Sequence, residues 1–247
     1  MVSTERIFKI LEDDLEITDN GNIEQSKFDG LIEFKNVSFS YIKNQLVIDD
    51  ISFIINPGET TAIVGPTGSG KTTITNLITK FYEIDLGTIL IDGEDINKFK
   101  LENLRKKIGV ILQDVFLFAD TIYNNITLFN AEISIKDVEK AAKDLEIHDF
   151  IMSLPGGYDF NVSERGGTLS AGQKQLIAFL RVLVNNPDIL ILDEATSSID
   201  SYSEDLIKNA TNKITKGKTS IIIAHRLSTV ENADKIIYME NGKILEY

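Results

Sequence analysis

Several short stretches of the chain are apolar at nearly every position. They are Ala62–Val64, Val110–Leu112, Ile189–Leu192, Ile221–Ala224 and Ile236–Met239. Strands that are covered on both faces have this pattern, which is typical of a parallel sheet with helices on either side. The pattern therefore predicts an α/β fold whose core is a mostly parallel sheet.

A second group of strands is expected early in the chain. Ile32–Phe39, Leu46–Ile55 and Thr88–Ile91 have the composition of strands, and a turn at Asn56–Glu59 follows the second of them. These strands predict a small antiparallel β-subdomain beside the core. Near the end of the chain, Asn241-Gly242 predicts a closing hairpin.

Helical periodicity dominates residues 120 to 185, and we expect an inserted helical subdomain at about residues 115–185. Ser134 and Asp137 have the spacing of a capping box, and Ser170 and Gln173 have it again. The helix after Ser134 has one apolar face, made of Val138, Ala141, Ala142 and Leu145. The helix after Ser170 has an apolar face made of Leu176, Ile177, Leu180, Leu183 and Val184.

The first residues differ from the rest. Residues 4–11 could form a short amphipathic helix, and the acidic, turn-rich stretch that follows is typical of a linker. We therefore expect residues 1–30 to be a linker segment and residues 31–247 to form the folded domain.

Composition narrows the class of protein. The 247 residues have a net charge of −13, no cysteine and no basic block, which argues against nucleic acid as the main partner. The absence of cysteine excludes disulfides and thiolate metal sites. No stretch approaches about 18 consecutive apolar residues, and Ile177–Val184 is interrupted by Arg181, so no segment is expected to cross a bilayer. His148 fits no motif, and we expect it on a helix surface.

The most specific motif is Gly65-Pro66-Thr67-Gly68-Ser69-Gly70-Lys71-Thr72, between an expected strand and an expected helix. It matches the phosphate-binding loop of nucleotide triphosphatases, in which backbone N–H groups and a helix N-terminus surround a polyphosphate. Lys71 adds a positive charge, and the Thr72 hydroxyl can bind Mg²⁺. The candidate nucleotide-binding residues here are Gly65, Thr67, Gly68, Ser69, Gly70, Lys71, Thr72 and Thr73. Lys71 is also a catalytic candidate.

Two carboxylates follow a buried strand at Asp193-Glu194. Ligands bind at the carboxyl ends of strands in open α/β sheets, so Asp193 is a candidate Mg²⁺ ligand and Glu194 a candidate for orienting the attacking water. An acidic pair that only ends a strand is the alternative. The phosphate loop makes that alternative the weaker one.

The segment Leu169-Ser170-Ala171-Gly172-Gln173 can be interpreted in two ways. It opens a well-capped helix, which is a sufficient explanation of these residues alone. The small residue Gly172 and the Ser170 hydroxyl at a helix N-terminus also suit an anion. A protein with two anion-binding helix ends could hold one nucleotide between two copies.

The ordered motifs GPTGSGKT, Gln113, LSAGQ, ILILDE, SSID and His225 resemble the nucleotide-binding domain of ATP-binding cassette (ABC) transporters over residues 31–247. The resemblance implies that Gln113 reaches Mg²⁺ and the membrane partner, and that Asp200 contacts an opposite subunit. It also implies that His225 hydrogen-bonds the γ-phosphate and that Tyr41 stacks on adenine. Ser170, Gly172 and Gln173 would contact the nucleotide of a second copy.

By this resemblance the chain is an Mg²⁺-dependent ATPase with a P-loop NTPase core. It would power export through separate transmembrane domains at the cytoplasmic face of the membrane, paired head-to-tail with a second nucleotide-binding domain. Residues 164–166 (Glu-Arg-Gly) and 117–122 resemble the exporter branch. Ala171 departs from the usual glycine. The chain also stops at Tyr247, before the family's usual terminal helix, which is expected of an excised or truncated domain.

Two other functions share these motifs. One is a soluble cassette ATPase that acts on ribosomes or DNA, which the acidic charge and the exporter-like segment disfavour. The other is a regulatory module that binds ATP without turnover, which the presence of Glu194 and His225 disfavours.

Overall fold

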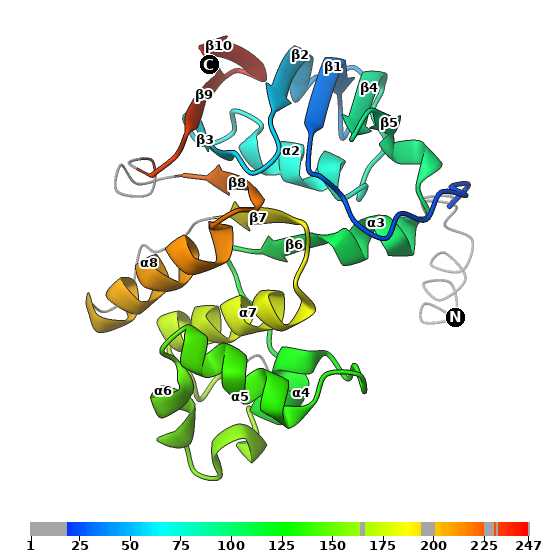
Figure 1. Cartoon of the computed structure of the whole chain (residues 1–247). Coiled ribbons are helices and arrows are strands. Elements are labelled where there is room, and N and C mark those ends of the chain that lie inside the picture. Colours follow the sequence, from blue (N-terminus) through cyan, green and yellow to red (C-terminus); the bar gives the residue numbers. More distant parts are fainter. Residues whose placement is uncertain (1–18, 164–165, 194–200, 225–229, 231, 247) are drawn as a thin grey trace, which may run out of the picture.

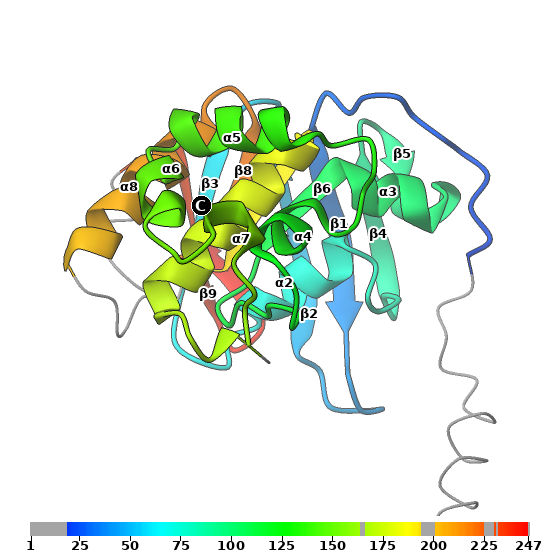
Figure 2. The ribbon, with the colours of Figure 1, turned by 90° about the horizontal axis from the view of Figure 1, so that it is seen from below.

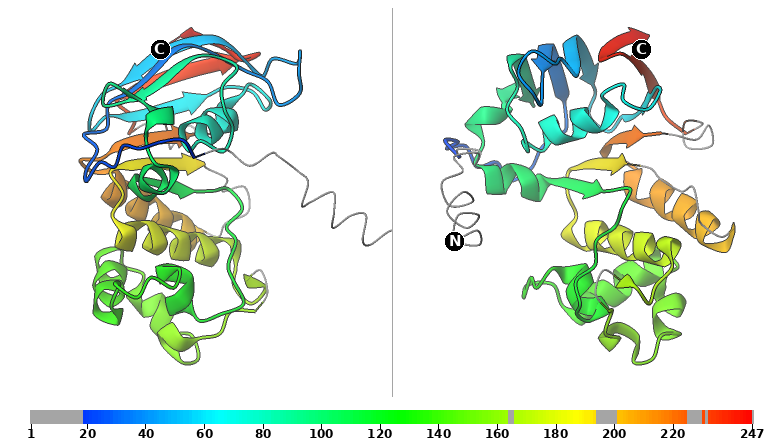
Figure 3. Two further views of the ribbon diagram at one scale, coloured as in Figure 1. Left: turned by 90° about the vertical axis from the view of Figure 1, so that its right-hand side faces the viewer. Right: turned by 180° about the vertical axis from the view of Figure 1, so that it is seen from behind.

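The structure is a computed structural model that describes residues 19–163, 166–193, 201–224, 230 and 232–246. Two β-sheets and a group of helices form layers, which are best seen in Figure 3 (left). The antiparallel sheet lies on one side, the main sheet lies in the middle, and most helices lie on the other side (Figure 1).

The smaller sheet is antiparallel and has four strands in the order β2-β1-β4-β5. Its strands are β1 (Ile32–Phe39), β2 (Ile48–Ile55), β4 (Leu86–Ile91) and β5 (Glu94–Asp95). Inward-facing residues alternate with exposed ones along β2, as expected for a sheet with one buried face. The expected β-subdomain is therefore present.

The main sheet has six strands in the order β10-β9-β3-β8-β7-β6. Its strands are β3 (Thr60–Val64), β6 (Ile108–Ile111), β7 (Ile189–Asp193), β8 (Thr219–Ile223), β9 (Lys235–Glu240) and β10 (Lys243–Glu246). Every neighbouring pair is parallel except β9 and β10, which form the expected closing hairpin. In its turn Asn241 and Gly242 both have positive φ, of 49° and 76°, as a type I′ turn requires.

The helices are α2 (Lys71–Ile78), α3 (Leu101–Lys107), α4 (Ile122–Thr127), α5 (Ile135–Asp144), α6 (His148–Met152), α7 (Ala171–Asn185) and α8 (Ser201–Thr215). Within the described residues, short 3₁₀ helices lie between β5 and α3, at η1 (Ile96–Lys98), and between α6 and α7, at η2 (Gly157–Asp159). Both predicted capping boxes are present, at α5 and α7. Helices α4 to α7 form the inserted helical part, which covers the sheet when the molecule is viewed from below (Figure 2). None of the described helices is long and apolar enough to span a membrane.

Two hydrophobic cores lie on opposite faces of the main sheet. One packs the antiparallel sheet and α2 against the sheet, and includes Phe34, Ile74 and Ile221. The other packs the sheet against the helices and includes Leu176, Leu192 and Ile222. Strands β7 and β8 are buried at all positions because both cores cover them.

Two apolar runs differ from the prediction that both faces are covered. In β9, Ile236 and Tyr238 are 45% and 37% exposed, because β9 lies next to the edge strand β10. Leu112 lies beyond the end of β6 and is 52% exposed. His148 lies on a helix, α6, as expected; it is partly buried there, with Nδ1 2.9 Å from the hydroxyl of Tyr158.

The segment before β1 lies against the domain from Asp19 onward. The carboxylate of Asp19 accepts hydrogen bonds from the Leu101 N–H at the start of α3. Phe28 is 2% exposed and packs edge-on against Phe99 at 5.2 Å between centroids. The second half of the expected linker is thus attached to the domain near the start of α3. The domain boundary at residue 31 stays a prediction. The helix expected at residues 4–11 lies outside the described residues.

Candidate nucleotide-binding site

The phosphate loop connects β3 to α2, as its motif requires. Gly65, Gly68 and Gly70 have φ of 152°, 82° and 102°, in the region that favours glycine. A Cβ at Gly65 would lie 2.0 Å from the carbonyl oxygen of Met239, so strand β9 also excludes a side chain there. Gly70 precedes α2, and among the described residues no side chain caps the first N–H groups of this helix. These groups are left for an anion.

Two side chains in the loop fit a bound polyphosphate. Ser69 is 2% exposed, and its buried hydroxyl has no hydrogen-bond partner among the described residues. Buried polar groups are normally paired, so this hydroxyl suits a ligand acceptor. Lys71 is 5% exposed, and its Nζ donates to the carbonyl oxygens of Gly65 and Pro66 at 2.8 and 2.9 Å. The ammonium is therefore held over the loop.

Asp193 brings a carboxylate to the loop from β7. The Thr72 hydroxyl lies 3.4 Å from Asp193 Oδ2, which joins positions 121 residues apart in the chain. Burial lowers the pKa of Lys71, and the nearby charge of Asp193 opposes this by raising it. A hydroxyl and a carboxylate beside a phosphate loop are the oxygen donors that Mg²⁺ prefers. The residues present therefore fit both triphosphate and Mg²⁺.

Gln113, Glu194 and His225 follow three neighbouring parallel strands of the main sheet, β6, β7 and β8, along the chain. Gln113 is exposed in the loop after β6, which pairs with β7. Glu194 follows β7 and His225 follows β8 by two residues, but both lie outside the described residues, as does Asp200. Their roles stay predictions.

Tyr41 is attached to the helix of the phosphate loop. Its hydroxyl donates to Thr73 Oγ1 at 3.2 Å and accepts from Asn76 Nδ2 at 3.1 Å. Its ring packs edge-on with Phe39 and Tyr82, at 4.8 and 4.9 Å between centroids, and is 44% exposed. An exposed aromatic ring beside the loop is suited to stacking on a base. The sequence motifs did not indicate Asn76 or Tyr82 as site residues.

Helix α7, which Ser170 caps, lies away from the phosphate loop of the same chain. Ser170 and Gln173 bond each other in a capping box: the Ser170 N–H donates to Gln173 Oε1 at 2.9 Å, and the Gln173 N–H donates to Ser170 Oγ at 3.2 Å. Helix α7 lies on the opposite face of the main sheet from α2 (Figure 1). Among the described residues, no hydrogen bond joins Ser170, Gly172 or Gln173 to the phosphate loop.

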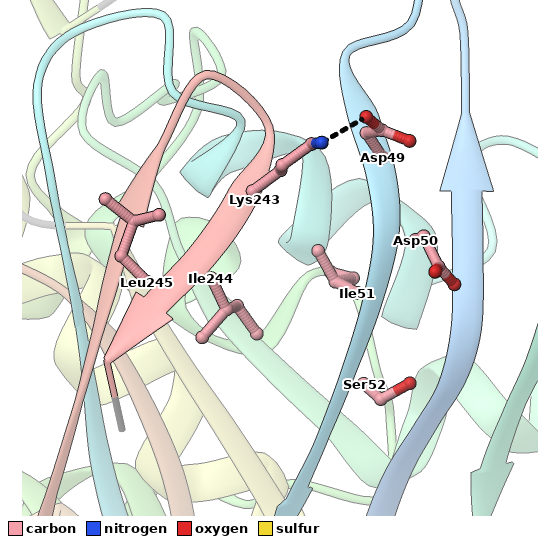
Figure 4. A pocket seen from close by; sticks show the side chains of 7 residues that line it. All are labelled: Asp49, Asp50, Ile51, Ser52, Lys243, Ile244 and Leu245. Atoms are coloured by element: carbon pink, nitrogen blue, oxygen red, sulfur yellow. Dashed lines mark ion pairs between the residues drawn. The ribbon is translucent and has the colours of Figure 1, made fainter.

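The closing hairpin contacts the phosphate loop and holds it in place. The Gly242 N–H donates to the carbonyl oxygen of Ser69 at 3.2 Å, and the Asp49 N–H donates to the Gly242 carbonyl oxygen at 2.9 Å. Lys243 forms an ion pair with Asp49 at 3.1 Å across a hollow of about 400 Å³ (Figure 4). The hollow is lined by Asp49, Asp50, Ile51, Ser52, Lys243, Ile244 and Leu245. It contains none of the predicted site residues, but its contacts fix the hairpin to β2.

This fold and this loop define a P-loop nucleotide triphosphatase with an inserted helical part. The chain belongs to the ABC transporter family, whose family model matches residues 48–197. ATP is the nucleotide implied by this membership.

Individual relatives agree with this assignment. The chain is 46% identical over 248 residues to the ATP-dependent lipid A-core flippase of Pseudomonas fluorescens, covering 100% of this chain and 41% of the flippase. It is 45% identical over 247 residues to the uncharacterized ABC transporter ATP-binding protein YfiC of Bacillus subtilis, covering 100% of this chain and 41% of YfiC.

A solved structure is similar across nearly the whole chain. It is a bacterial Atm1-family ABC exporter with ATP bound, with a TM-score of 0.90 and 39% sequence identity. The similarity covers 99% of this chain and 43% of that exporter. The chain thus spans less than half the length of the relatives it matches.

Proposed function

We propose that the chain is the ATP-hydrolysing domain of an ABC exporter. The observation that carries the proposal is the meeting of Thr72 and Asp193 at 3.4 Å beside the buried Lys71. It joins a hydroxyl, a carboxylate and a cation where a nucleotide's β- and γ-phosphates would lie in a P-loop site.

Each residue has one task in this site. The backbone from Gly65 to Gly70 and the buried Ser69 hydroxyl bind phosphate oxygens, and Lys71 neutralises their charge. Thr72, Asp193 and Gln113 would hold Mg²⁺. A bound Mg²⁺ would supply positive charge that offsets the negative charge developing during phosphoryl transfer. Tyr41 orients the adenine ring, and its bonds to Thr73 and Asn76 keep it close to the loop.

Glu194 and His225 supply the chemistry at the γ-phosphate. Glu194 directly follows Asp193, so its carboxylate is suited to accept a hydrogen bond from the attacking water and orient it. His225 follows the neighbouring strand β8 and can hydrogen-bond the γ-phosphate. Both act by positioning, which suits the loose transition state of phosphoryl transfer.

A second copy, or a related domain, completes the site. Helix α7 lies on the other face of the sheet from α2, so Ser170, Gly172 and Gln173 are suited to the nucleotide of a partner. Asp200 would contact the same partner. Two domains paired head-to-tail then enclose two nucleotides, and each site closes only around ATP.

The export function is supported by the names of the relatives, a flippase and an Atm1-family exporter, whose chains are more than twice as long as the matched part. We infer that transmembrane domains are the partners and that this domain lies at the cytoplasmic face of the membrane. The net charge of −13 disfavours nucleic acid as a partner.

A matched pair of lysine variants tests this function. Lys71→Ala removes the cation nearest the phosphates and should weaken ATP binding at least about tenfold, measured by calorimetry with MgATP. Lys98→Ala removes an exposed lysine that pairs with Glu94 and should leave ATP binding unchanged. Near-parental ATP affinity in a folded Lys71→Ala variant would contradict the assignment of the site.

A further inference from the structure

Asn125, in α4, organises the loop that follows Gln113. It is completely buried, and its side chain bonds both backbone groups of Phe118: Oδ1 accepts from the N–H at 2.8 Å and Nδ2 donates to the carbonyl oxygen at 3.0 Å. Nδ2 also donates to the Thr121 carbonyl oxygen at 3.0 Å. One amide therefore fixes the loop's end to α4.

Arg181, in α7, also bonds both α4 and the loop that follows Gln113. Its Nε donates to the backbone oxygen of Asn125 at 3.0 Å, and its Nη2 donates to the backbone oxygen of Phe116 at 3.3 Å. The guanidinium thus bonds the loop and α4 at once.

The position of Arg181 is unusual for a charge. It is partly buried, and within the described part of the chain no carboxylate forms an ion pair with it. Burial lowers the pKa of the guanidinium, which nevertheless stays protonated at physiological pH. Burying a charge without an opposite charge costs free energy unless its donors are used. The bonds from Nε and Nη2 to two carbonyl oxygens offset part of this cost.

We propose that Arg181 is a positioning residue that couples the Gln113 loop to the helix beginning at Ser170. This inference rests on the proposed function. Gln113 would act on the nucleotide of its own chain, and Ser170 on the nucleotide of the partner. Arg181 lies on the same helix as Ser170 and holds the loop that contains Phe116, three residues after Gln113. A shift of the loop in one site therefore moves the helix end that closes the other site.

The coupling has a distinct kinetic consequence. Arg181 bonds the backbone of Asn125 and Phe116, not the phosphate loop, and Gln113 would act through Mg²⁺. The dissociation constant of Mg-free ATP for the monomer should therefore not depend on Arg181. Turnover needs both sites to close, so kcat and the cooperativity of hydrolysis should depend on it.

The test compares Arg181→Met with a matched control, Arg105→Met. Arg105, in α3, also donates from Nε and Nη2 to two backbone carbonyls, those of Thr79 and Lys80, at 3.2 and 2.9 Å. Arg181→Met should lower kcat at least about threefold and move the Hill coefficient toward unity, with the dissociation constant of Mg-free ATP for the monomer within about twofold of the parent. Arg105→Met should lower thermal stability but keep the parental kcat and Hill coefficient.

Arg181→Lys provides the second variant. A lysine can reach one of the two carbonyls but cannot bridge both with a planar fork, so kcat should lie between those of the parent and Arg181→Met. This variant also carries the test if Arg181→Met does not fold. Parental kcat and cooperativity in a folded Arg181→Met, or in Arg181→Lys where Met does not fold, would overturn the inference alone. A parent chain that does not bind or hydrolyse ATP would overturn the proposed function together with it.

Discussion

The Gly242 N–H donates a hydrogen bond to the carbonyl oxygen of Ser69 at 3.2 Å. This contact joins the turn of the last hairpin to the phosphate loop. The same turn is fixed to β2 through Asp49, which bonds Gly242 and forms an ion pair with Lys243. The phosphate loop is therefore held by a part of the chain that is more than 170 residues away in sequence.

The first prediction concerns Gly242→Val. Gly242 has a φ of 76°, and a Cβ there would lie 2.5 Å from the carbonyl oxygen of Val47. The change should displace the hairpin from Ser69, weaken ATP binding several-fold and lower the free energy of unfolding by about 1–3 kcal/mol. Calorimetry with ATP and denaturant unfolding measure the two effects.

Gly217→Val is the control for backbone strain. Gly217 has nearly the same φ, 75°, but a Cβ there would meet no atom of the described residues within 4 Å. It should lose stability and keep the parental ATP affinity. Equal ATP affinity in the two variants would show that the hairpin does not support the loop.

The second prediction separates the two interpretations of Ser170. Ser170→Arg should leave ATP binding to the phosphate loop intact and block ATP-driven pairing, because a bulky side chain would occupy the surface that closes on the partner's nucleotide. Losing the cap should also cost roughly 1 kcal/mol of stability. Gel filtration with ATP measures the pairing.

Ser134→Arg is the matched control, since Ser134 heads α5 with the same kind of capping box and is also exposed. It should lose similar stability and still pair. If Ser170→Arg pairs as well as Ser134→Arg does, Ser170 is only a helix cap.

The third prediction concerns the two histidines. His225→Ala should keep ATP binding and lower kcat on the order of a hundredfold, because the lost hydrogen bond is made to the γ-phosphate. His148→Ala loses the hydrogen bond and the ring contact with Tyr158 in the helical part, so it should cost about 1 kcal/mol of stability and spare turnover. A His225→Ala variant with weaker ATP binding and unchanged kcat would contradict the switch role.

Local sequence patterns predicted the features that depend on contacts within one element or on the burial of a whole strand. The runs at Ile189–Leu192 and Ile221–Ala224 became the fully buried strands β7 and β8. The capping spacings at Ser134 and Ser170 were confirmed because a cap is a contact within one helix turn. In β9, periodicity could not tell whether a helix covers Ile236, since this depends on neighbouring strands.

Contacts between distant segments could not be predicted from the sequence. The bond from Gly242 to Ser69 depends on how the sheets stack, and no local pattern indicates it. The sequence does show Arg181 as a single charge within the apolar run Ile177–Val184. Its role could not be predicted, because its partners, the carbonyl oxygens of Phe116 and Asn125, are known only from the structure. A lone arginine beside the apolar face of a helix is a pattern that could be searched for elsewhere.

The central claim is that two copies close around ATP and that hydrolysis reopens them. Glu194→Gln keeps the size of the side chain and removes the charge that polarises the attacking water. This variant should bind ATP, fail to hydrolyse it and remain closed, because the phosphate groups that join the loop of one copy to the Ser170 helix of the other are not cleaved.

Gel filtration of Glu194→Gln tests this most directly. We expect a dimer with MgATP or Mg-free ATP and a monomer with ADP, whereas the parent protein stays largely monomeric during turnover. If the natural partner is a different domain, the variant should pair with that domain only when ATP is present. Unimpaired ATP hydrolysis by Glu194→Gln, or a dimer that forms equally with ATP, with ADP and without nucleotide, would contradict the account.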